Sequence, residues 1–170
     1  YMLFSFSLSI FLILLFLGGI FNNVNEKITD SLYGGGKINN DIVIIGIDDQ
    51  SINKIGRWPW GRDEYVEILK ILNQSRVIGV DIGFYEESEN DSELFEYLNS
   101  QDNIVLAAEY LNFDVKENQI IGGNKLTPIT GNSFGYVNVI TNIDSITRGV
   151  NLNVIGEIKH FDEEIYSKYT

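Results

Sequence analysis

Residues 77–108 read VIGVDIGFYEESENDSELFEYLNSQDNIVLAA, and this stretch decides the fold class. Its two ends, residues 77–82 and residues 104–108, are uninterrupted apolar runs rich in β-branched and small side chains. Such runs are typical of strands that are covered on both faces of a sheet. Between them, Asn90 and Glu93 resemble a capping box ahead of the apolar positions of a helix. The stretch therefore predicts a strand, a helix and a second strand, which a right-handed crossover makes parallel.

The flanking sequence continues this alternation in both directions. Residues 41–47, DIVIIGI, predict a further parallel strand, and the apolar positions within residues 65–72 have the spacing of an amphipathic helix. Towards the C-terminus, residues 135–140 and 150–155 predict an antiparallel hairpin, and a last short helix begins near Phe161. The predicted fold class is α/β: a mixed, largely parallel sheet with helices on both faces plus an antiparallel hairpin, preceded by one transmembrane helix.

The opening segment, residues 1–21, contains no Asp, Glu, Lys, Arg or His side chain. As a helix it spans roughly 30 Å, the thickness of the hydrocarbon core of a bilayer, and we interpret it as a transmembrane helix. A secretory signal peptide and a buried core helix are the alternatives, and the segment lacks the small-x-small site at which signal peptides are cleaved. The predicted organisation is a transmembrane helix over 1–21, a juxtamembrane helix and linker over 22–40, and an extracytoplasmic α/β domain over 41–170.

The first residue is Tyr1 rather than methionine, so we expect the chain to be a fragment. The last predicted helix runs to the end of the chain, and we expect the domain to be truncated at its C-terminus. Val24, Ile28 and Leu32 recur at a spacing of four, which predicts a helix up to the glycines at 34–36. That helix is either an amphipathic segment packed on the domain or a stiff rod that carries a signal. Residues 22–41 contain no excess of positive charge, so we expect the body of the chain to lie outside the cytoplasm.

Composition excludes several classes of protein. The 170 residues contain 12 Lys and Arg against 24 Asp and Glu, a net charge of −12, which argues against a nucleic-acid partner. The absence of cysteine excludes a disulfide scaffold, a cysteine zinc site and a thiol nucleophile. We also find no phosphate-binding glycine loop and no nucleophile elbow, and the single histidine, His160, is predicted on the surface where the last helix begins.

Acidic residues follow the predicted strands. Asp48 and Asp49 follow the first strand, Asp81 lies late in the second and Glu109 follows the third. Carboxyl ends of parallel strands meet at one edge, where open α/β sheets bind ligands, so these carboxylates are predicted to gather there. They have three possible roles: capping of the following turns and helices, binding of a ligand, or holding Mg²⁺ for phosphoryl chemistry.

A loop with the sequence GRWPWGR contains both tryptophans of the chain, Trp58 and Trp60, together with Arg57 and Arg62. Its connection is longer than most strand-to-helix loops, and loops of this length are commonly functional. Aromatic rings beside guanidinium groups can stack on a planar ligand or clamp an anion. Alternatively the indoles plug the open end of the sheet while the arginines neutralise Asp48 and Asp81.

The stretches 41–52, 56–62 and 77–86 resemble the hallmark stretches of the second type of CHASE domain, and residues 135–138 and 144–148 are similar to a further one. The resemblance covers roughly residues 24–170, with Gly61 and Ser145 departing from the family pattern. It implies a non-catalytic extracytoplasmic input domain, preceded by one membrane helix and followed by others that lead to a cytoplasmic adenylate cyclase, kinase or phosphatase.

The predicted function is therefore a sensory, signal-input domain in the cell membrane, with its soluble part extracytoplasmic. The alternatives are a membrane-tethered hydrolase that uses Asp48 and Asp81 with Mg²⁺, and a structural interaction module. No catalytic residue, metal or cofactor is predicted. The predicted partners are the lipid bilayer, a second copy in a homodimer and a small-molecule or protein stimulus, with no nucleic acid. The candidate ligand-binding residues are Asp48, Asp49, Arg57, Trp58, Trp60, Arg62, Asp81 and Glu86.

Overall fold

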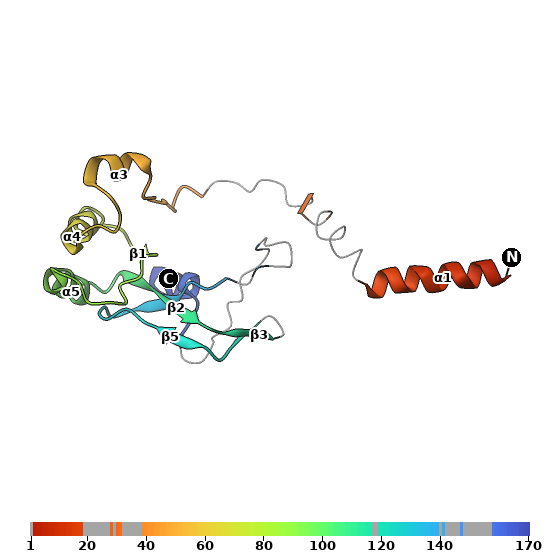
Figure 1. Ribbon diagram of the computed structural model, residues 1–170. Coiled ribbons are helices and arrows are strands. Elements are labelled where there is room, and N and C mark those ends of the chain that lie inside the picture. Colours follow the sequence, from red (N-terminus) through yellow and green to blue (C-terminus); the bar gives the residue numbers. More distant parts are fainter. Residues whose placement is uncertain are drawn as a thin grey trace. The chain divides into compact units, whose positions relative to one another are not determined.

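The computed structural model describes residues 2–18, 28, 30–31, 39–116, 119–139, 141, 147 and 158–170 (Figure 1). The chain divides into two compact units, Tyr1–Gly46 and Ile47–Thr170, and each is described by itself.

The first unit contains helix α1 (Met2–Leu17), 16 residues without an acidic or basic side chain in either end turn. Large apolar side chains from Phe4 to Leu17 are exposed along it. Within the described residues, no helix combines the length and the apolar character that crossing a membrane requires. Residues 19–21 of the predicted span and most of the predicted helix over 24–33 lie outside the described residues.

The second unit is a mixed α/β domain. Its helices and strands, in chain order, are α3 (Asp49–Ile55), α4 (Arg62–Ile71), β1 (Ile78–Val80), α5 (Asp91–Ser100), β2 (Ile104–Leu111), β3 (Asp114–Lys116), β4 (Gln119–Ile121), β5 (Asn124–Leu126), β6 (Phe134–Tyr136) and α6 (Phe161–Tyr169). Residues 77–82 and 104–108 were predicted as parallel strands, and both predictions are confirmed by β1 and β2. The amphipathic spacing over residues 65–72 corresponds to α4, and the last short helix corresponds to α6.

The four-stranded sheet is built around β2. β1 and β6 both run parallel to β2, with Ile78 opposite Ile104 and Leu106 opposite Phe134. β5 is antiparallel to the C-terminal part of β2, with Glu109 opposite Leu126. β3 and β4 form a separate antiparallel pair. The sheet is therefore mixed, as predicted.

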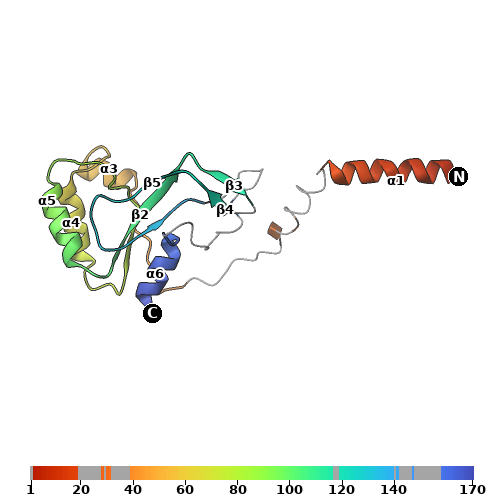
Figure 2. The same ribbon diagram turned by 90° about the horizontal axis from the view of Figure 1, so that it is seen from below.

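Helices cover both faces of this sheet (Figure 2). On one face, buried residues of α4 and α5 form a core with Ile78 and Leu106. On the other face lies α6, which approaches so closely that a β-carbon added at Gly79 would meet the side chains of Phe161 and Ile165. Adjacent residues of a strand face opposite sides of the sheet. Ile78 therefore faces α4 and α5, and Gly79 faces α6. Gly135 of β6 faces the backbone of Phe161 in the same way.

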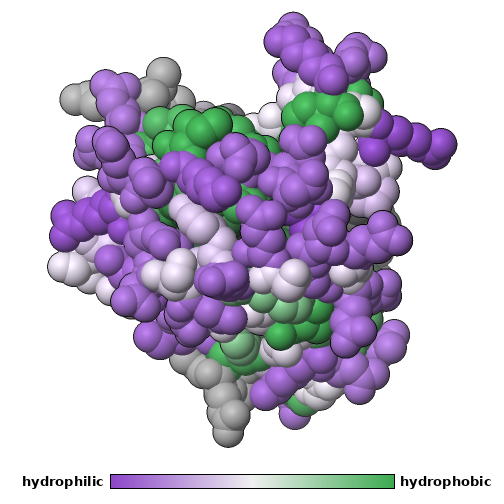
Figure 3. All heavy atoms as spheres, turned by 90° about the vertical axis from the view of Figure 1, so that its left-hand side faces the viewer, coloured by the Kyte–Doolittle hydropathy of each residue, from purple (hydrophilic) through white to green (hydrophobic). Residues whose placement is uncertain are grey.

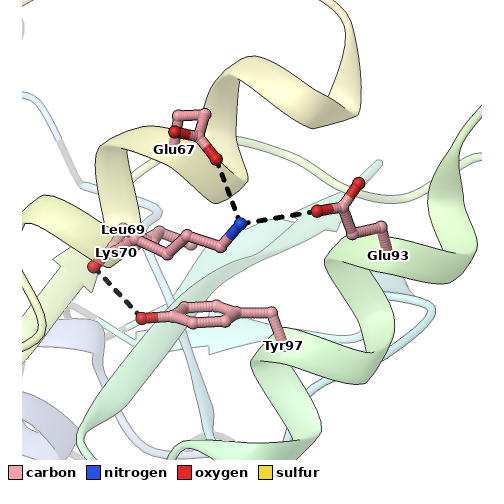
Figure 4. Close-up of polar contacts among 5 residues, drawn as sticks. All are labelled: Glu67, Leu69, Lys70, Glu93 and Tyr97. Carbon is pink, nitrogen blue, oxygen red and sulfur yellow. Dashed lines mark hydrogen bonds and ion pairs between the residues drawn. The ribbon is translucent and has the colours of Figure 1, made fainter.

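Polar contacts join α4 to α5 at their outer side (Figure 4). The Lys70 ammonium lies 3.0 Å from a Glu67 oxygen on its own helix and 3.5 Å from a Glu93 oxygen on α5. The Tyr97 hydroxyl donates a hydrogen bond of 3.3 Å to the Leu69 carbonyl. Polar side chains cover most of this end of the molecule, with separate apolar patches between them (Figure 3). The lysine bridge is exposed, so it contributes little to stability, and the buried apolar face holds the helices together.

Two local predictions are wrong. Residues 42–47 form no strand: the side chain of Ile44 is 90% exposed and that of Val43 is 79% exposed. A strand requires a neighbour, and β-branched composition supplies only a preference that depends on such packing. The expected capping box is also absent, because Asn90 occupies the N-cap of α5 with a left-handed backbone and makes no side-chain cap bond.

The structure describes only residues 135–139 of the predicted C-terminal hairpin. Its first half contains β6, which pairs in parallel with β2, and residues 150–155 of its second half lie outside the described residues. The antiparallel pairs that the structure describes occur earlier, between residues 109 and 126. The short β3, β4 and β5 segments have three residues each, too few for an alternating pattern to stand out in the sequence.

Candidate functional site

The tryptophan loop closes one end of the core. The bond between Trp58 and Pro59 is cis. The ring of Trp58 meets the rings of Trp60 and Tyr65 edge-on, with centroids 5.8 and 6.1 Å apart. Trp60 packs against the core, and its Nε1 donates a hydrogen bond of 2.8 Å to the Gly56 carbonyl. This packing agrees with the alternative in which the indoles close the open end of the sheet. It also leaves Trp60 at the surface of the core beside the loop.

Arg62, the first residue of α4, fixes the segment that follows β1. Its Nε lies 2.7 Å from an Asp91 carboxylate oxygen, and its Nη2 donates a hydrogen bond of 2.9 Å to the Glu86 carbonyl. The guanidinium also lies 4.8 Å from the centre of the Phe84 ring. Both charged side chains of the pair are largely buried, with 12% and 13% of their surface exposed. Arg62 is therefore engaged on three sides within the protein.

A hollow of about 600 Å³ lies between these two segments, at the carboxyl end of β1. One wall comes from the tryptophan loop, one from the segment after β1, and one residue comes from β5. The lining residues are Pro59, Trp60, Gly61, Arg62, Gly83, Tyr85, Glu86, Glu87, Ser88, Glu89, Asn90 and Leu126. A smaller hollow of about 280 Å³ lies between α4 and α5 beside Lys70.

The hollow is acidic. Glu86, Glu87 and Glu89 line it and are exposed. Burial raises the pKa of the Tyr85 hydroxyl, and the negative charges of Glu109 and Asp81 raise it further. Asp81 and Glu109, two of the carboxylates expected at the strand ends, thus both act on this hydroxyl.

The remaining predicted residues lie elsewhere. Asp48 is the N-cap of α3: its Oδ1 accepts hydrogen bonds from the Ser51 amide at 2.8 Å and the Ser51 hydroxyl at 2.7 Å. The Ser51 amide, and then its hydroxyl, lower the pKa of Asp48. Asp49 lies in the first turn of α3, and Arg57 is exposed. None of these three lines the hollow.

Asp48 therefore has the capping role, which is one of the three roles considered for the strand-end carboxylates. The expectation that the arginines neutralise Asp48 and Asp81 is wrong for Arg62, whose carboxylate partner is Asp91. Within the part of the chain that the structure describes, no three His, Cys, Asp or Glu side chains are grouped so as to hold a metal ion.

Sequence reasoning brought Trp60, Arg62 and Glu86 to one place but missed most of the lining. Tyr85 and the polar run 87–90 directly follow the predicted second strand, and this position was the signal that could have identified them. Of this run, only Asn90 has a predicted role, as part of a helix capping box. Leu126 had no such signal, because β5 was not predicted.

The histidine prediction is corrected too. His160 is the N-cap of α6 as expected, but only 4% of it is exposed. Its Nδ1 accepts a hydrogen bond of 3.3 Å from the Asp162 amide, and its ring meets the Tyr136 ring edge-on at 4.9 Å. A parallel β-bridge between Tyr136 and His160 places His160 beside β6. The local sequence does not reveal this tertiary contact.

Comparison with known proteins gives one match. Among protein-family models, the CHASE2 domain matches residues 7–170. No curated protein and no solved structure gives a significant match.

Proposed function

The chain belongs to the CHASE2 domain family, and from this premise we propose that it is the extracytoplasmic signal-input domain of a membrane-bound adenylate cyclase or histidine kinase. CHASE2 domains are non-catalytic sensory domains, typical of the extracellular part of signalling proteins. The observation that carries the proposal is the family match over residues 7–170. The output enzyme, in this proposal, is a separate part of the signalling protein.

We place the stimulus site at the acidic hollow. Three predicted residues, Trp60, Arg62 and Glu86, line it, and the ring of Trp58 contacts the ring of Trp60. The hollow lies at the carboxyl end of a parallel strand, where open α/β sheets bind ligands. Asp81 and Glu109 contribute negative charge through their proximity to Tyr85. Asp48, Asp49 and Arg57 are left out of the proposed site because they do not line the hollow.

We propose that residues 1–21 anchor the domain in the membrane. The segment has no Asp, Glu, Lys, Arg or His, and the apolar side chains of α1 are exposed, as a lipid-facing helix requires. Residues 22–40 then connect the anchor to the sensory domain over 41–170. In a homodimer, a shift of this connection passes the signal on as a rigid-body movement. A stimulus drives the shift only if it binds the two states of the domain with different affinity.

The test uses the signalling protein in its own cells. Replacing both Trp58 and Trp60 by alanine should abolish stimulus-dependent output, measured as cyclic AMP or as kinase phosphorylation. Ile71→Ala, at an 80% exposed position on α4, is the matched control and should leave output unchanged.

Because Trp60 packs on the core, the double variant also needs a melting curve of the purified chain. If it does not fold, Trp58→Ala alone is used, since that ring is 40% exposed. Unchanged output from a folded Trp58 variant and from Glu86→Gln together would remove the hollow from the signalling path.

A further inference from the structure

We propose that the hollow binds a linear aliphatic polyamine, an organic cation with several ammonium groups separated by methylene chains. This inference rests on the proposed function, because it names the chemical class of the stimulus at the same site. It is carried by a cavity whose lining combines carboxylates that form no ion pair among the described residues with aromatic and apolar side chains.

The charges of the lining exclude an anion. In the described part of the chain, the lining residues carry three carboxylates, those of Glu86, Glu87 and Glu89, and one cation, Arg62. That guanidinium is already used: it pairs with Asp91, donates to the Glu86 carbonyl and lies over a buried ring. An anion entering the hollow therefore finds no available positive charge, whereas an ammonium group finds three carboxylates.

Two further carboxylates act on Tyr85, an aromatic residue of the lining. Tyr85 lines the hollow, and the carboxylates of Asp81 and Glu109 act on its hydroxyl. Burial, and then the charges of Glu109 and Asp81, raise the pKa of this hydroxyl, so Tyr85 presents a neutral ring and a hydroxyl donor or acceptor. A cation in the hollow is attracted by these charges together with those of the three glutamates.

The walls suit an organic cation better than a metal ion. Trp60 and Tyr85 give the lining two aromatic side chains, which attract ammonium groups and pack on methylene groups, and Pro59 and Leu126 add apolar surface. The glutamates are spread along the segment after β1, and the described residues contain no metal-binding group of acidic or histidine side chains. A linear polyamine, which has several ammonium groups at intervals along an apolar chain, therefore matches this lining.

The experiment measures binding of spermine to the purified full chain in neutral detergent by calorimetric titration. The variant Glu86→Gln/Glu87→Gln/Glu89→Gln removes the three carboxylates of the hollow. The control Glu96→Gln/Asp102→Asn/Asp114→Asn removes the same charge from exposed positions that do not line the hollow. We expect the first variant to raise the Kd for spermine at least about tenfold and the control to change it less than about twofold.

A second pair of variants examines the aromatic wall. Tyr85→Phe keeps the ring and should bind spermine as the parent chain does, whereas Tyr85→Leu should weaken binding. Melting curves of every variant show that the domain is folded. Equal weakening by the two triple variants would mean diffuse attraction to an acidic protein and would overturn the proposal, as would binding of Mg²⁺ or choline in preference to spermine.

Failure of this inference is distinguishable from failure of the proposed function. If the tryptophan variants abolish signalling but spermine does not bind, the hollow takes another ligand and the sensory role stands. If spermine binds as expected but does not change output in cells, the binding site stands and the sensory role at this hollow fails.

Discussion

Arg62 holds together three places that are far apart in the sequence. It begins α4, its carboxylate partner Asp91 begins α5, and the carbonyl that it binds belongs to Glu86, in the segment after β1. The same carboxylate accepts a hydrogen bond of 2.6 Å from the Ser88 amide. Since Glu86 and Ser88 both line the hollow, this ion pair fixes the shape of the wall. Its role is therefore to position the site.

The Asp91 carboxyl should make the stability of the domain depend on pH. Burial raises its pKa, but the Ser88 amide and the charge of Arg62 together outweigh burial, so its pKa is below the ordinary value of 3.8. A carboxyl with a lowered folded-state pKa stabilises the fold above its unfolded-state pKa, and this contribution is lost as the pH falls through the folded-state value. We expect Asp91→Asn to lower the unfolding free energy by about 1–3 kcal/mol at neutral pH.

Urea denaturation of both proteins, from neutral pH downward, measures this difference. The two curves should converge as the pH falls below the folded-state pKa of Asp91. Glu93→Gln is the matched control: its carboxylate is 60% exposed and lies 3.5 Å from Lys70, so its removal should have almost no effect at any pH. A constant difference between Asp91→Asn and the parent chain at all pH values would contradict the role of the charge.

Single residues also show where sequence reasoning reaches its limit. Trp60, Arg62 and Glu86 were expected together at the strand-end edge, and all three line the hollow although the first predicted strand does not form. The partner of Arg62 could not be assigned. Asp91 is 29 residues away, and nothing in the spacing distinguishes it from Asp48 or Asp81. Charge pairing is decided by side-chain geometry, which composition does not contain.

The elements that were predicted correctly have both a long pattern and a neighbour. α4, α5 and β2 each have buried residues at the expected spacing, and they form one core. Residues 42–47 have the stronger β-branched composition, yet they form no strand in the structure. Propensity was therefore a reliable guide only where packing agreed with it.

Helix α6 depends on a close approach to the sheet that only glycine permits. A β-carbon at Gly135 would lie 2.6 Å from Phe161 Cα and 2.8 Å from its backbone nitrogen. These are backbone atoms, so relief requires the helix to move rather than a side chain to rotate. We expect Gly135→Ala to lower the unfolding free energy by about 1–3 kcal/mol.

Gly46→Ala is the control for this substitution, because a β-carbon there meets nothing within 4 Å. Denaturation of the two variants measures the difference, and we expect Gly46→Ala to change stability by less than about 0.5 kcal/mol. Hydrogen exchange should show that the loss at Gly135 is concentrated in α6. Equal stability of both variants would mean that α6 does not pack against β6 as described.

For the molecule as a whole, the N-terminal segment and the sensory domain were separable in the sequence by charge alone. Every Asp, Glu, Lys, Arg and His of the chain lies after residue 21. The structure divides the chain into two compact units. The proposed membrane location rests on the apolar sequence of residues 1–21 and on the family, so a direct measurement of location has the greatest value.

That measurement compares two matched charge substitutions in cells. Leu8→Arg/Leu12→Arg places two charges in the middle of the apolar segment, at a cost of roughly 2.5–3.5 kcal/mol each if it inserts as a helix. The parent chain should stay with the membrane after alkaline extraction, and the double variant should be released. Ile71→Arg adds a charge at an exposed position of α4 and should not release the chain.

Protease added to intact cells then determines which side the domain occupies. The absence of a positive excess after the apolar segment favours an extracytoplasmic domain, because positively charged flanks stay in the cytoplasm. We therefore expect residues 47–170 to be degraded in intact cells and a cytoplasmic marker protein to survive. Introducing lysines at Asn22 and Asn23 should reduce the degraded fraction, since the new charges favour the opposite orientation. Full protection of the unmodified chain would place the hollow on the cytoplasmic side, where an extracellular stimulus cannot reach it.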